Sequence, residues 1–67
     1  SKAYAFLREA LEIVTNIERL DAKWQACGEA RQWASGETAK AIWTDAERYR
    51  QHVKTEYARL KKLCETL

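Results

Sequence analysis

The chain has 67 residues, of which 46% are hydrophobic and 33% are charged, and its formal net charge is +2. The high apolar content excludes a disordered chain. Charged residues are interspersed along the whole sequence, so no apolar run is long enough for a membrane span. We therefore expect one helical domain over residues 1–67, with no membrane association and a cytoplasmic location. Methionine is absent even at position 1, so we expect a processed chain or a piece of a longer protein.

The first predicted element is a helix over residues 2–34. Apolar side chains recur at alternating intervals of three and four residues, which places them on one helical face and fits no strand. This main stripe comprises Ala3, Phe6, Ala10, Ile13, Ile17, Leu20, Trp24, Cys27, Arg31 and Ala34. Trp24 is expected to be buried there, and Arg31 is expected to extend its charge to solvent. A second stripe on a neighbouring face contains Tyr4, Leu7, Leu11 and Val14.

The stretch WASGET, residues 33–38, separates this helix from the next. Gly36 is expected to adopt the positive φ that ends the first helix, because glycine tolerates that conformation. Ser35 or Thr38 is expected to cap the start of the second helix with its side-chain oxygen. The stretch is therefore predicted to be a turn.

The second predicted element is a helix over residues 37–66. Its main stripe comprises Ala39, Ile42, Ala46, Tyr49, Val53, Glu56, Leu60, Leu63 and Leu67. Trp43 and Tyr57 flank this stripe on one side. Two helices of similar length with facing apolar stripes predict an all-α antiparallel hairpin.

A three-helix bundle is the alternative fold, with a break in the first half near Asp21 or Gly28. The hairpin is favoured because such a break leaves two short helices to cover one long helix. A lone hairpin, however, leaves the second stripe in water, so we expect it to dimerise into a four-helix bundle.

In length and in its Ala/Leu layers, this architecture resembles the plasmid repressor-of-primer hairpin. That resemblance implies a dimeric four-helix bundle that regulates by binding RNA. It rests on no shared motif, and no RNA-contacting residue is transferred from it.

The leading functional hypothesis is a non-enzymatic module for protein–protein interaction or oligomerisation, with a second copy and another protein as partners. We expect no catalytic residue, cofactor or metal, because no nucleophile with a base, glycine-rich phosphate loop or pair of converging carboxylates is present. The predicted interface is Tyr4, Leu7, Leu11, Val14, Trp33, Trp43 and Tyr57.

Nucleic-acid binding is the second hypothesis, because residues 37–67 carry seven basic and five acidic side chains. A row of basic residues on one helical face suits phosphate binding. The predicted nucleic-acid face comprises Lys40, Arg48, Lys54, Arg59, Lys61 and Lys62. The weakest hypothesis is an enzyme site between the helices around Glu56, Arg50 and His52.

Glu56 is the charged residue in the middle of the second main stripe, and we expect it to pair with Arg19 or Arg59. Cys27 and Cys64 are expected near opposite ends of a monomeric hairpin, too far apart for a disulfide. Both are expected to be reduced, although a head-to-tail dimer leaves an intermolecular bridge open.

Overall fold

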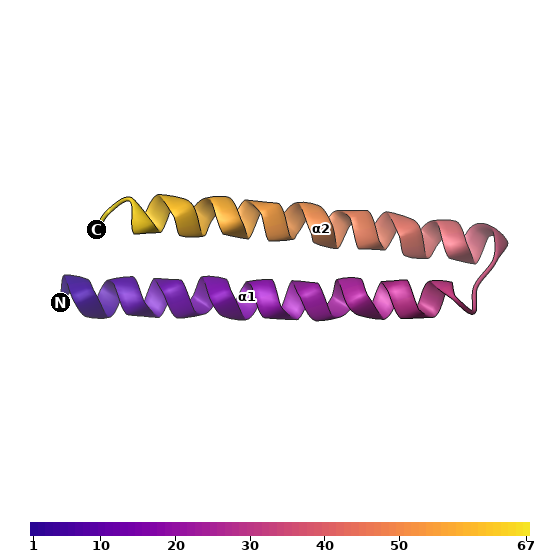
Figure 1. Ribbon diagram of the computed structural model, residues 1–67, viewed down its shortest axis with the longest axis horizontal. Helices are drawn as coiled ribbons and strands as arrows, with labels where there is room; N and C mark the ends of the chain where they lie inside the picture. The colour runs from indigo at the N-terminus through magenta and orange to yellow at the C-terminus, as the bar shows by residue number, and fades with distance from the viewer.

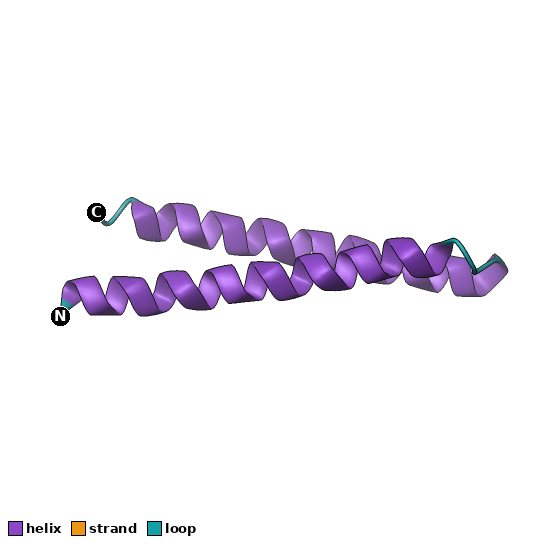
Figure 2. Ribbon diagram, turned by 60° about the horizontal axis from the view of Figure 1, so that its bottom comes forward, coloured by secondary structure: helices purple, strands orange, loops and turns teal.

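The computed structural model describes all residues from 1 to 67 as two antiparallel helices joined by a short link (Figure 1). Helix α1 spans Lys2–Arg31 and helix α2 spans Gly36–Cys64. The rod measures 52 × 14 × 11 Å, with both termini at one end. Figure 2 shows that the helices cross at a shallow angle. The predicted two-helix hairpin is confirmed.

The three-helix alternative is wrong, because α1 runs unbroken through both proposed break points. Asp21 caps no helix; its carboxylate accepts a hydrogen bond from the Gln25 side chain at 3.0 Å, one turn further along. Gly28 lies in the helix interior with open space around its Cα. A single glycine costs a helix only about 1 kcal/mol, which the surrounding helix-forming residues offset.

The turn is present, but α1 ends three residues earlier than residue 34. After Arg31 the amides of Trp33 and Ala34 bond three residues back instead of four, to Ala30 at 3.1 Å and Arg31 at 3.3 Å. These tighter bonds satisfy the last carbonyl groups and close the helix without a glycine. The role predicted for Gly36 at the end of the first helix is therefore wrong.

Gly36 does have the predicted positive φ, 58°, but it is the first residue of α2. Ser35 occupies the N-cap position in extended conformation, and its side chain makes no capping hydrogen bond. Thr38 lies inside α2. The backbone conformation of Ser35 and Gly36, rather than a side-chain cap, turns the chain into α2.

Substituting alanine for each glycine should change stability in opposite directions. Gly36→Ala should lower the free energy of unfolding by about 1–2 kcal/mol, because alanine is strained at positive φ. Gly28→Ala should raise it by about 0.5–1 kcal/mol, because alanine favours a helix interior. A new Cβ meets no atom within 4 Å at either site, so the backbone alone sets the sign. Urea unfolding measures both; equal signs would contradict the turn described here.

The core lies between the main stripes of the two helices. Only Ile13, at 0% exposure, and Ala46, at 6%, are buried. Most other residues of the main stripes are half-buried, because two helices alone cannot enclose a side chain from every direction. Trp24 is 43% exposed, so the expectation of its burial is wrong. Its indole is wider than the contact between two helices, and no third element covers its outer edge.

Neither helix has an apolar stretch long enough to cross a bilayer.

Candidate functional site

The hairpin has two long sides of different chemistry, which follow from the residues that flank the main stripe of each helix. On one side the ion pair of Arg59 with Glu9 joins the helices. On the other side one hollow is lined by both Gly28 and Trp43. We call the first the polar side and the second the apolar side.

The apolar side carries large hydrophobic side chains that no other part of the chain covers. Its residues are Tyr4, Leu7, Leu11, Val14 and Trp24 of α1, and Trp43 and Tyr57 of α2; all are exposed, by 41% to 62%. On a helix, side chains three and four positions apart lie on one face, so Tyr4, Leu7, Leu11 and Val14 form a continuous stripe, and Trp24 lies ten residues further towards the turn. Six of the seven predicted interface residues therefore lie together on this side.

Trp33, the seventh predicted interface residue, is separate from the others. It lies in the link at the end of the rod and is 86% exposed. Trp43, the next tryptophan along the chain, lies inside α2 and contributes to the apolar side. The structure therefore divides the predicted interface into a long apolar side and a single indole at the turn.

Towards the turn, the apolar side contains a shallow pocket. The hollow has a volume of about 320 Å³, and its lining includes Trp24, Gly28 and Trp43. The guanidinium of Arg31 lies over the Trp43 ring, 4.8 Å from its centroid. Arg31 is exposed, as expected, and its charge rests on an aromatic face instead of in the core.

Glu56 is held by a polar network on the opposite side of the hairpin. Its carboxylate accepts hydrogen bonds from Arg59 and from the Asn16 amide, both at 3.3 Å. Arg59 also pairs with Glu9 at 3.6 Å and Glu12 at 3.7 Å. The predicted partnership of Glu56 with Arg59 is confirmed, whereas Arg19 forms no ion pair. Arg59 thus joins one carboxylate of α2 to two of α1.

The predicted nucleic-acid face is not a single row of free charges. Arg59 is turned towards α1, because an arginine beside the main stripe is long enough to reach across it. Lys40 pairs with Glu37 at 3.5 Å and Arg48 with Asp45 at 3.1 Å. The remaining members, Lys54, Lys61 and Lys62, are exposed and form no ion pair.

Loss of the Arg59 network should destabilise the hairpin more than loss of an ordinary surface pair. Arg59→Gln leaves three carboxylates close together without a cation, and we expect a loss of about 1 kcal/mol. Arg48→Gln, which breaks one exposed pair, should cost less than about 0.5 kcal/mol. Urea unfolding at pH 7 compares the two variants. Equal losses would show that the network adds nothing beyond a surface ion pair.

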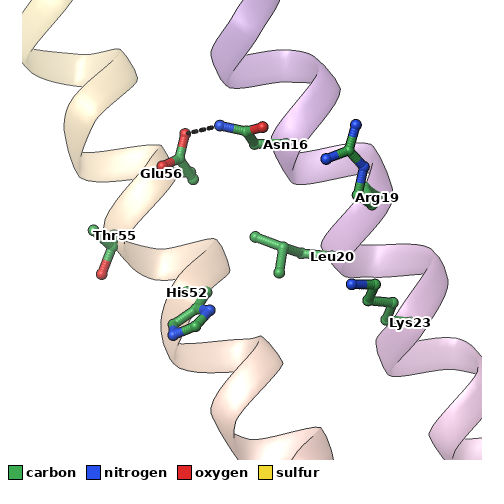
Figure 3. A pocket seen from close by; sticks show the side chains of 7 residues that line it. All are labelled: Asn16, Arg19, Leu20, Lys23, His52, Thr55 and Glu56. Carbon is green, nitrogen blue, oxygen red and sulfur yellow. Dashed lines mark hydrogen bonds between the residues drawn. The ribbon is translucent and has the colours of Figure 1, made fainter.

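The polar side also contains a groove between the helices, about 400 Å³ in volume (Figure 3). Its lining residues are Asn16, Arg19, Leu20, Lys23, His52, Thr55 and Glu56. Glu56 and His52 of the enzyme hypothesis lie together here, but Arg50 lines a hollow on the apolar side with Trp24. The proposed trio is therefore not assembled.

The sequence pattern did not predict that Arg19 and Lys23 line a shared groove. A signal was present, since the two cations stand one helical turn apart with no acid three or four positions from either. Neither forms an ion pair with any carboxylate.

The two cysteines form no disulfide with each other; Cys27 is half-buried and Cys64 is exposed. No three His, Cys, Asp or Glu side chains are grouped so that they could hold a metal ion. Comparisons with protein-family models, curated proteins and solved structures find no match to this chain. Function is therefore inferred from the two sides of the hairpin alone.

Proposed function

We propose that this protein is a non-enzymatic helical-hairpin module that self-associates through its apolar side. The observation that carries the proposal is the continuous exposed stripe of Tyr4, Leu7, Leu11 and Val14, extended across the hairpin by Tyr57. Contiguous apolar patches of this kind mark interfaces in soluble proteins.

The small core also supports association. A hairpin with two buried residues out of 67 withdraws little apolar surface from water. Short domains of this size commonly gain the missing stability from a partner, a metal or disulfides. Here no disulfide links the two cysteines within the chain, and the exposed apolar side is the surface whose burial would supply that stability.

A second copy is the partner that fits the dimensions of the apolar side. One entire side of the hairpin, 52 × 14 Å, projects roughly 700 Å² per chain, and the exposed apolar side chains occupy part of that area. Stable interfaces bury about 800 Å² on each partner. In a two-fold dimer the same surface serves both chains, and two hairpins joined by such faces form a four-helix bundle.

Thermal unfolding at a series of protein concentrations tests this proposal. Unfolding of a dimer is coupled to dissociation, so its midpoint temperature rises with protein concentration. We expect that rise across the micromolar range, with no change on addition of reductant because the interface is non-covalent. A midpoint that is independent of concentration would count against self-association.

Two further predictions stay open beside this proposal. The first is a second protein partner, different from this chain. Trp33 does not lie on the apolar side, so the proposed dimer leaves its indole exposed for such a partner.

The second is nucleic-acid binding, which is the alternative function. Of the six residues of the predicted nucleic-acid face, Lys54, Lys61 and Lys62 are the ones that form no ion pair and so support it. A band shift with RNA or DNA that weakens with salt would favour it.

A further inference from the structure

We infer that the groove on the polar side is a binding site for a small phosphorylated anion of the diphosphate class. The site is built by Arg19 and Lys23 of α1 and by His52 of α2, which line the same groove and are labelled in Figure 3. It lies on the opposite side from the proposed dimer interface, so it does not depend on that interface.

The two cations of α1 carry the argument. Like charges one turn apart on a helix repel each other and destabilise it slightly. Arg19 and Lys23 have this spacing, both line the groove, and neither forms an ion pair with a carboxylate of the chain. A bound anion with two adjacent charged groups would relieve this repulsion.

The one carboxylate that lines the groove does not cancel these charges. Glu56 already accepts hydrogen bonds from Arg59 and Asn16, both at 3.3 Å. Those contacts hold it beside its own cation, at the end of the groove near Asn16 (Figure 3). Arg19 and Lys23 therefore remain available to a ligand.

α2 adds a third donor and steadies the second cation. The His52 imidazole lies across the groove and can donate an N–H to an oxyanion. The Lys23 ammonium lies 5.6 Å from the centroid of the Tyr49 ring, a contact that orders the side chain without neutralising it. Thr55 is not counted, because its hydroxyl donates to the Gln51 carbonyl of its own helix.

The ligand is expected to be a small anion rather than a nucleic-acid strand. Proteins that bind single strands stack successive bases on exposed aromatic rings. No Phe, Tyr or Trp ring lines the groove. Leu20 is the one apolar side chain in the lining. Recognition therefore rests on charge and on N–H donors.

The test is titration of the wild-type protein with pyrophosphate at about 20 mM salt, where electrostatic binding is least screened. Amide chemical shifts should change around Arg19, Lys23 and His52. The double variant Arg19→Gln/Lys23→Gln should bind about tenfold more weakly or worse, because it loses two charged donors. Circular dichroism should show both helices intact in the variant, since the substitutions remove a repulsion.

The matched control is Lys54→Gln/Lys61→Gln, which removes the same charge from the face of α2 that carries Tyr57, away from the groove. It should change affinity by no more than about twofold, through long-range attraction alone. Equal weakening in both double variants, or no shift at millimolar pyrophosphate, would overturn the site. Tight binding of a single-stranded RNA under conditions where pyrophosphate does not bind would also overturn it. Pyrophosphate binding by a variant that cannot dimerise, such as Leu7→Ala/Leu11→Ala, would show that this site does not require the proposed interface.

Discussion

Replacing both Leu7 and Leu11 with alanine is expected to turn the dimer into a monomer while α1 stays helical. Each leucine is about half exposed in the single hairpin, by 51% and 57%, so about half of its surface remains to be buried on association. Losing that burial costs about 1 kcal/mol per side chain, or about 4 kcal/mol for the four leucines of a dimer. Alanine is the best helix former, so helicity is retained.

The expected readout is a rise of about a thousandfold in the dimer dissociation constant. Leu67→Ala is the matched control, because Leu67 is an 88% exposed leucine beyond the end of α2. It should leave the dissociation constant unchanged. If the double variant assembles as well as the control, the apolar side is not the interface.

Ile13→Ala is expected to have the largest effect of any single substitution on the hairpin itself. Ile13 is the one large side chain that is fully buried, and truncation leaves a cavity between the two helices. Such substitutions cost about 2–5 kcal/mol, a large share of the stability of a domain of this size. Urea unfolding followed by circular dichroism should show a strongly lowered midpoint, or a chain that no longer folds.

The adjacent residue provides the comparison for this experiment. Val14 is 41% exposed and lies on the apolar side, so Val14→Ala should cost about 1 kcal/mol or less. Both variants keep the helix-forming character of α1. A cost for Ile13→Ala no larger than that for Val14→Ala would mean that the core is not centred where the structure places it.

The helices and their pairing were predictable because three-four spacing directly reports which face of each helix is apolar. The spacing identified Ile13 and Ala46 as residues of the main stripes. It did not identify them as the only buried ones, because burial depends on how many neighbours surround a side chain. Trp24 shows the difference, since it lies on the correct face but at an uncovered edge.

The end of α1 was missed for a related reason. Apolar spacing continues to Ala34, but the helical hydrogen bonds change to the tighter pattern after Arg31. The spacing of apolar residues indicates the direction in which side chains point. It does not indicate whether a backbone amide donates its hydrogen bond to the carbonyl three or four residues back. The positive φ of Gly36 was predictable, because glycine is the residue for which that conformation costs nothing.

The charged residues were the least predictable part of the candidate site. Arg59 was assigned to an outward face from its position, yet its long side chain reaches the carboxylates of α1. The groove of Arg19, Lys23 and His52 depends on the register between helices, which the sequence specifies only loosely. Once the facing residues of α2 are known, it is clear that no carboxylate of α2 pairs with Arg19 or Lys23.

Sedimentation equilibrium, with and without reductant, tests the central claim most directly. We expect a species of twice the 7.8 kDa chain mass at micromolar concentrations, unaffected by reductant because the proposed interface is apolar and contains neither cysteine. A species of 7.8 kDa at every concentration would contradict self-association through the apolar side.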